Sequence, residues 1–136
     1  MTDLGDLLVS GAELDRQLVA GVLKPVLGID KDSLRVRPGE RWNDLSARAK
    51  ILAFLLGRKA MIALGLSIPQ EAVAPLQIIA ETGIPKGTVA PKLKVLYESR
   101  PQLVDRDAQS RYWVPDWAVN NVCDIIKAEL TKGARG

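Results

Sequence analysis

The tripeptide Gly83-Ile84-Pro85 constrains the fold of this chain more than any other feature of its sequence. Apolar side chains recur at helical spacing on both sides of it, at Ile78, Ile79, Val89, Leu93 and Leu96. Glycine adopts the positive φ that ends a helix at little cost, and proline suits the first turn of the next one. Residues 76–97 are therefore predicted to form two short helices, each with one buried side, joined by a turn too short to let them separate.

Two helices joined in this way are the layout of a helix-turn-helix, whose second helix is offered to the major groove of DNA. Pro91 falls inside that second helix, where an interior proline costs about 3 kcal/mol. We therefore predict that regular helix begins near Pro91, after an irregular first turn over residues 86–90 that faces phosphate. Val89, Leu93 and Leu96 are predicted to lie in the core.

The composition removes many function classes. Histidine is absent and Cys123 is the single cysteine, which excludes Ser-His-Asp and Cys-His catalysis, zinc and iron–sulfur sites and an internal disulfide. The sequence has no convergent pair of carboxylates and no glycine loop of the kind that cradles phosphate. We therefore expect a protein that is not an enzyme and needs no cofactor or metal.

The same composition bears on location and size. The 136 residues, 47% of them apolar, suffice for one domain with a helical extension. No run of 18 apolar residues occurs, so a membrane span is not expected. The acidic start MTDLGD differs from the basic start of a secretory signal, and one cysteine fits a reducing compartment. A cytoplasmic location is expected.

The net charge of +3 is unevenly distributed. Residues 1–30 carry five acidic and two basic side chains, whereas residues 31–60 carry three acidic and eight basic ones. Residues 83–114, which include the proposed second helix, carry three acidic and six basic side chains. This basic region suits a polyanionic partner, although an ordinary solvated surface would have the same charges.

An N-terminal helix is predicted from Gly11 onward, with Ser10 and Glu13 as a capping box and Pro25 ending the regular helix near residues 23–24. Its apolar face is broad, so it must pack on the domain's own core or on a dimer partner.

Residues 28–42 are predicted to be irregular or extended, with a turn at Pro38-Gly39. Three arginines make this the most basic short segment, namely Arg35, Arg37 and Arg41. We expect it either to follow a DNA backbone as an arm or to be a loop of solvated charges.

A long helix is predicted over residues 45–64, capped by Asn43 or Asp44. It is apolar on most sides and should be the buried spine of the fold. Gly57 within it is expected to let another helix come close.

Two strands are predicted after the second short helix, over residues 103–106 and 111–114, with residues 107–110 at the tip. If Ala108-Gln109 forms the loop, Arg106 faces Arg111, and the two repel unless a phosphate or acidic group lies between them. Ala-Gln is poor chemistry for a tight turn, which leaves the register open. A last helix is predicted to about residue 131, capped by Asp116, with one apolar stripe: Val119, Val122, Cys123, Ile126 and Leu130.

The order of these elements over residues 45–130 resembles the winged helix-turn-helix superfamily. Residues 87–96, GTVAPKLKVL, are similar to the GT-x-x-P-x-L-x-x-L signature in the recognition helix of PadR-family regulators, with Ala90 where that family usually has an aromatic. The preceding TGIPKGTV is similar to MarR-type regulators. The resemblance implies a mainly α fold with a small β-hairpin wing, an α+β class. A winged helix-turn-helix domain with a C-terminal helix would span residues 43–131, after an N-terminal helix and basic linker over 1–42 for packing or dimerisation and before a tail over 132–136.

Taken with the charge pattern, the resemblance implies sequence-specific binding of double-stranded DNA by a dimeric transcription regulator. At the start of the recognition helix, Lys86, Gly87 and Thr88 would meet phosphate, unless Thr88 only caps the helix. Lys92, and less directly Lys94, would reach base edges. The wing would touch backbone or minor groove through Arg106, Gln109, Ser110 and Arg111.

Two alternatives remain open from the sequence. A plasmid or phage replication or partition protein would have the same features. A winged-helix module that binds another protein and no DNA would also fit the modest total charge and the acidic N-terminus.

Overall fold

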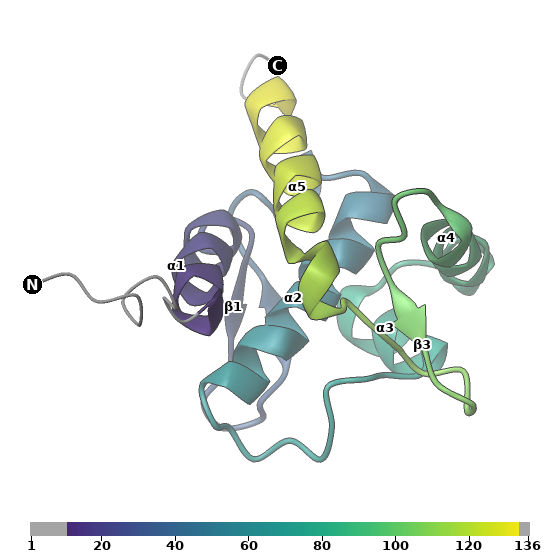
Figure 1. Cartoon of the computed structure of the whole chain (residues 1–136), viewed down its shortest axis with the longest axis horizontal. Coiled ribbons are helices and arrows are strands. Elements are labelled where there is room, and N and C mark those ends of the chain that lie inside the picture. Colours follow the sequence, from purple (N-terminus) through teal and green to yellow (C-terminus); the bar gives the residue numbers. More distant parts are fainter. Residues whose placement is uncertain (1–10, 134–136) are drawn as a thin grey trace, which may run out of the picture.

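A computed structural model describes residues 11–133 of the chain (Figure 1). These residues form five α-helices: α1 Gly11–Leu23, α2 Ala47–Ala63, α3 Pro75–Thr82, α4 Lys86–Glu98 and α5 Val119–Gly133. They also form two antiparallel pairs of strands, β1 Leu27–Ile29 with β2 Val36–Pro38 and β3 Asp105–Arg106 with β4 Tyr112–Trp113. Short 3-10 turns precede two of the helices, η2 Trp42–Asp44 before α2 and η3 Asp116–Ala118 before α5. The predicted mainly α composition with a small β-hairpin is confirmed.

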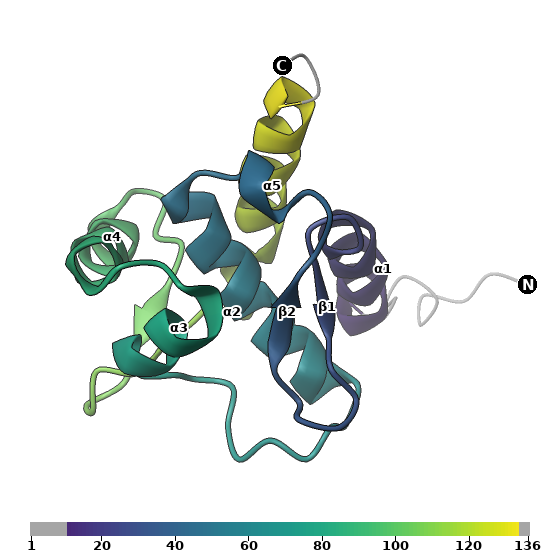
Figure 2. The ribbon, with the colours of Figure 1, turned by 180° about the vertical axis from the view of Figure 1, so that it is seen from behind.

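Helix α2 runs through the middle of the molecule and contacts each of the other four helices (Figure 2). Most of its side chains are buried, including Ile51, Leu52, Phe54, Leu55, Leu56 and Met61. The prediction of a buried central helix is confirmed. The helix is buried because it is apolar on most sides, and exposing any of these sides to water would be unfavourable.

The predicted cap of α2 is wrong. Neither Asn43 nor Asp44 caps the helix, because both lie in the η2 turn. Ser46 is the N-cap, and its hydroxyl accepts a hydrogen bond from the Ala49 N–H at 3.2 Å. Glu129 of α5 accepts two more bonds at this cap, from the Ser46 N–H at 2.7 Å and from the Ser46 hydroxyl at 2.8 Å. The start of the central helix is therefore tied to the last helix.

The terminal helices α1 and α5 contact each other and α2 within one chain. The apolar stripe predicted for α5 is buried throughout, and α1 buries Val19, Val22 and Leu23. Helix α1 ends at Leu23, as Pro25 predicted. The proposed capping box lies outside what the structure describes, since Ser10 and the Glu13 side chain fall there. These helices pack on the domain's own core.

The predicted N-cap of α5 is also wrong. Asp116 lies inside the η3 turn, which follows Pro115, and makes no capping bond. Its carboxylate instead accepts a hydrogen bond from Lys59 of α2 at 2.7 Å. The Asp116 carboxylate thus links α2 to the η3 turn just before α5. It does not accept a hydrogen bond from a backbone N–H group at the helix start.

The segment between α1 and α2, predicted to be irregular or extended, contains the extended strands of the β1–β2 hairpin. Asp30 shapes its turn by accepting hydrogen bonds from the backbone N–H groups of Asp32 and Ser33 and from Arg37 Nε. These bonds lower the pKa of Asp30 to about 2. The hairpin lies against α2 and α3, and Gly57 faces its side chains Leu27 and Val36 rather than a neighbouring helix.

Candidate nucleic-acid interface

The turn between α3 and α4 has the predicted geometry. Helix α3 begins with Pro75 at its first position, and Gly83 ends it with a φ of 74°. The Thr82 hydroxyl donates to the Ile78 carbonyl at 2.6 Å and accepts from the Ile84 N–H at 3.2 Å. Ile84 is buried, so the turn is fixed by local hydrogen bonds and by one apolar side chain beneath it.

The predicted start of regular helix near Pro91 is wrong. Helix α4 is regular from Lys86 and contains Pro91 in its interior, with Pro85 as its N-cap. Pro91 removes the hydrogen bond that the Gly87 carbonyl would otherwise accept. Both residues are exposed, so water can satisfy that carbonyl and the helix continues through the proline.

The first turn of α4 leaves donors unpaired. The N–H groups of Thr88 and Val89 both donate to the Pro85 carbonyl, at 2.9 and 3.1 Å. Those of Lys86 and Gly87 have no acceptor among residues 11–133. The Thr88 hydroxyl makes no capping bond, which removes the alternative that Thr88 only caps the helix. Unpaired N–H groups at a helix start attract an anion.

Helix α4 has one buried side and one open side. Val89, Leu93 and Leu96 are buried as predicted. At 100° per residue, Lys94 lies about 130° from the middle of this buried row, on the open side, and Lys92 lies about 65° from it, on the flank. The exposed side also carries small residues, Gly87, Ala90 and Pro91. The open side of α4 therefore combines small residues with exposed lysines, and it also carries Val95 and Glu98.

The lysines of α4 are uncompensated. Lys86, Lys92 and Lys94 are all exposed, and none forms an ion pair with any residue that the structure describes. By contrast, the basic segment before α2 is largely neutralised internally. Arg37 pairs with Asp30 at 2.7 Å and Arg41 pairs with Asp44 at 2.9 Å. In the proposed backbone-following arm, Arg35 and Lys31 are the cations left without an ion pair to any described residue.

The β3–β4 hairpin differs from its predicted register. Its strands are two residues long, and Arg106 pairs with Tyr112, not with Arg111. The reason is the Asp107 side chain, which accepts hydrogen bonds from the N–H groups of Gln109 and Arg111 and builds a longer loop than Ala108-Gln109. Ser110, with a φ of 59°, completes this loop.

The tip of the hairpin holds one arginine in place. Arg111 Nε lies 2.9 Å from Asp107 Oδ2, and a terminal nitrogen of Arg111 donates to Gln109 Oε1 at 3.1 Å. The Arg111 backbone N–H is the main cause of a lowered pKa at Asp107. Gln109 and Ser110 are exposed, while Arg111 is half-buried and neutralised. Because Arg106 does not face Arg111, the repulsion expected for a tight Ala108-Gln109 loop does not arise, and Asp107 neutralises Arg111 within the tip.

The hairpin is attached to the helices at two points. Val73, just before α3, exchanges backbone hydrogen bonds with Tyr112 at 3.0 and 2.8 Å. Arg106 lies over the ring of Tyr97 on α4, with 4.4 Å between its guanidinium carbon and the ring centroid. In both views α4 and the hairpin tip lie at the same edge of the molecule, away from α1 (Figures 1 and 2). The predicted residues of helix and hairpin therefore share one edge.

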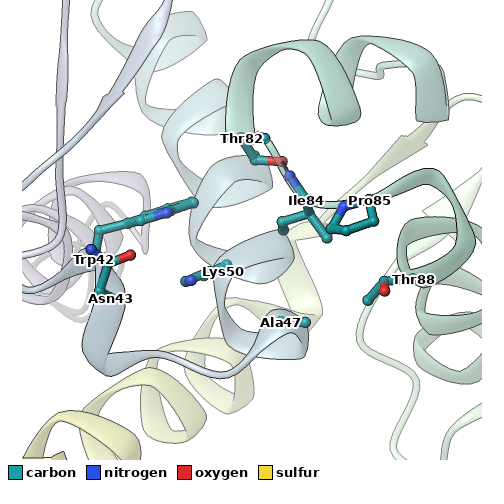
Figure 3. Close-up of a pocket in the computed structure, with 9 residues that line it drawn as sticks. Trp42, Asn43, Ala47, Lys50, Thr82, Ile84, Pro85 and Thr88 are labelled. Atoms are coloured by element: carbon teal, nitrogen blue, oxygen red, sulfur yellow. Dashed lines mark hydrogen bonds between the residues drawn. The ribbon is translucent and has the colours of Figure 1, made fainter.

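A feature that the sequence did not predict lies beside the α3–α4 turn. A hollow of about 360 Å³ separates η2 and the first turns of α2 from residues 82–88 (Figure 3). Trp42, Asn43 and Lys50 line one side. Lys50 belonged to a visibly basic stretch, but only tertiary packing brings it opposite the turn.

No protein-family model, curated protein or solved structure matched the chain. Within residues 11–133, none of the helices has the length and apolar character needed to cross a bilayer. The same residues contain no cluster of acidic or cysteine side chains suited to a metal ion.

Proposed function

We propose that the chain is a winged helix-turn-helix protein that binds double-stranded DNA. In this proposal α3 and α4 are the helix-turn-helix, α4 enters the major groove, and the β3–β4 hairpin is the wing. The observation that carries the proposal is the set of three exposed lysines on α4, Lys86, Lys92 and Lys94, none of which forms an ion pair with a described residue. The similarity of residues 82–96 to PadR- and MarR-type regulators also supports it.

The contacts divide by role. Lys94 and Lys92 are proposed to reach base edges, because they lie on the open side and flank of α4. The unpaired N–H groups of Lys86 and Gly87 are proposed to bind a backbone phosphate. Arg106 is the proposed backbone or minor-groove contact of the wing, together with Gln109. Arg111 is assigned instead to the shape of the wing, because Asp107 neutralises it.

A homodimer acting as a transcription regulator remains part of the proposal. The buried stripes of α1 and α5 are already covered within one chain, so the dimer surface would use other side chains. The exposed Ile62 and Leu64 at the end of α2 are candidates. Light scattering coupled to size exclusion, with and without Leu64→Ser, tests this part: the variant should shift the mass toward the monomer, and a monomeric parent protein would refute it.

Electrophoretic mobility of pooled genomic fragments at several salt concentrations tests the proposal as a whole. If the four exposed cations Lys86, Lys92, Lys94 and Arg106 each displace about one condensed counterion, the logarithm of affinity should fall with the logarithm of salt concentration at a slope of about −4 per chain. Absence of binding at low salt, or binding that salt does not weaken, would reject the proposal.

One observation favours a protein partner instead. Val95 on α4 and Leu76 on α3 are 59% and 70% exposed, which places two apolar side chains on the helices of the candidate interface. If a protein docks there, Val95→Ser should abolish a stoichiometric complex while duplex DNA fails to bind. If the protein binds duplex DNA and forms no complex with another protein, this second function is rejected.

A further inference from the structure

We propose that the hollow beside the α3–α4 turn is a binding site for a phosphate-type oxyanion. This inference stands on the hollow itself and does not rest on the proposed function. The ligand is defined by its chemistry, a group with several negatively charged oxygens. Its source is either a nucleic-acid backbone or a free phosphorylated compound.

The first observation is an uncompensated cation. Lys50 is partly buried, yet among the side chains that the structure describes, those of residues 16–132, no carboxylate lies within 4.0 Å of its ammonium group. Its contact is the ring of Trp42, with 6.0 Å between Nζ and the ring centroid. None of the nine residues that line the hollow is acidic. A cation that is partly removed from water without a counter-ion favours an anionic ligand.

The second observation is a donor that opens into the hollow and has no acceptor among the described residues. Trp42 is only 4% exposed and lines the hollow, but its indole N–H makes no hydrogen bond with any described residue. The indole nitrogen is not among the solvent-inaccessible side-chain atoms that lack a partner, so solvent in the hollow reaches it and its N–H can donate to a bound acceptor. Figure 3 shows the ring of Trp42 extending from one wall toward the α3–α4 turn, with the end of Lys50 directed toward Trp42 and Asn43.

The other wall adds donors from a different direction. The Thr88 hydroxyl lines the hollow and has no partner among residues 11–133. The unpaired N–H groups of Lys86 and Gly87 follow directly after Pro85, which lines it too. An ammonium, an indole N–H, an amide, a hydroxyl and backbone N–H groups together suit an anion with several acceptor oxygens better than a single carboxylate.

The probe is inorganic phosphate, and the readout is the indole N–H resonance of Trp42 in ¹⁵N-labelled protein. The chain has three tryptophans, so Trp42→Phe assigns the signal. We expect a saturable shift with phosphate and none with chloride at equal ionic strength. Lys50→Met keeps the aliphatic part of the side chain and should lower the affinity for phosphate roughly 10- to 100-fold. Lys24→Met, at an exposed site that does not line the hollow, should bind as the parent protein does.

A second variant guards against a folding defect at Lys50. Asn43 is exposed, so Asn43→Asp should fold normally while placing a carboxylate at the hollow, and it should abolish the phosphate response. Amide spectra that match the parent protein confirm the fold. A saturable response that persists in Asn43→Asp and Lys50→Met would overturn the proposal.

The source of the oxyanion follows from a second titration with duplex DNA. If the DNA backbone supplies the oxyanion, duplex DNA shifts the Trp42 resonance and Lys50→Met lowers the affinity of the protein for the duplex. If a free compound supplies it, phosphate shifts the resonance while Lys50→Met leaves duplex affinity unchanged. A Trp42 resonance that responds to neither ligand overturns the proposed anion site. Loss of duplex binding in α4 lysine variants would still support the proposed function in that case, so the two failures are distinguishable.

Discussion

Arg106 of the β3–β4 hairpin lies over the ring of Tyr97 on α4, with 4.4 Å between the guanidinium carbon and the ring centroid. This contact joins the two elements that would touch DNA. It also holds an exposed arginine in one orientation, because a cation is attracted to the face of an aromatic ring. The position of the hairpin relative to α4 therefore depends partly on a single aromatic side chain.

Tyr97→Leu should weaken DNA binding more than it weakens the fold. Loss of the cation–π contact costs about 0.5–1 kcal/mol at an exposed site, and the hairpin remains paired to Val73. Tyr97→Phe keeps the ring and should bind as the parent protein does. Thermal melts and fluorescence anisotropy with a labelled duplex measure the two effects. Equal affinities for the Leu and Phe variants would show that the ring does not position Arg106.

Protonation of Asp107 should loosen the hairpin tip. Its pKa is lowered chiefly by the Arg111 N–H, so its contribution to stability is present above the ordinary value of 3.8 and is lost as the pH falls through the lowered value. Amide signals of residues 107–111 should therefore shift together between pH 4 and lower pH. Asp107→Asn should shift them at neutral pH and remove that titration. A tip that titrates in the same way in the Asn variant would contradict the assignment.

Glu71 should have the opposite pH dependence. Burial raises its pKa, and Lys59, which lies 3.3 Å from one carboxylate oxygen, offsets only part of this effect. A raised pKa means that the charged form costs stability, so the free energy of unfolding should increase as the pH falls through the raised value toward 4.5.

Glu71→Gln tests this directly. It should remove the pH dependence and change stability at pH 7 by no more than about 1 kcal/mol, because Lys59 keeps its bond to Asp116. Urea unfolding at pH 7 and pH 5 provides the measurement. A variant that is several kcal/mol less stable, with its pH dependence intact, would show that the ion pair dominates.

The contributions of Ser46 and Glu129 to the free energy of unfolding should be coupled, because the two residues join α2 to α5. Ser46→Ala removes an N-cap, a loss of about 1 kcal/mol, and Glu129→Gln weakens the two bonds that α5 makes to that cap. Because both residues act at one helix end, the double variant should lose less than the sum of the single losses. Chemical denaturation of the four proteins measures this coupling, and strict additivity would contradict it.

Local chemistry allowed much of the helical part to be predicted. Gly83 ended α3 as expected, and the apolar spacing of α4 identified its buried row. These signals lie within a few residues of the structure that they determine. The exposed positions of Lys86, Lys92 and Lys94 followed from the same spacing.

The predictions were wrong where residues distant in the sequence, or side-chain hydrogen bonds, determine the local structure. The Ser46 cap is completed by Glu129, 83 positions away in the sequence. The hairpin register is set by Asp107, whose carboxylate lengthens the loop. The hollow exists because η2 and the α3–α4 turn pack side by side. The turn of the β1–β2 hairpin did have a local signal, since aspartate at Asp30 favours such a turn.

The most direct test of the central claim compares two charge-matched double variants in duplex DNA binding across salt concentrations. Lys92→Gln with Lys94→Gln alters the open side and flank of α4, whereas Lys127→Gln with Lys132→Gln removes the same charge from exposed positions on α5. We predict that the α4 variant binds far more weakly, with a salt slope about 2 units shallower, while the α5 variant matches the parent protein. Equal affinities for the two variants, or no binding by the parent protein at low salt, would contradict DNA binding by α4.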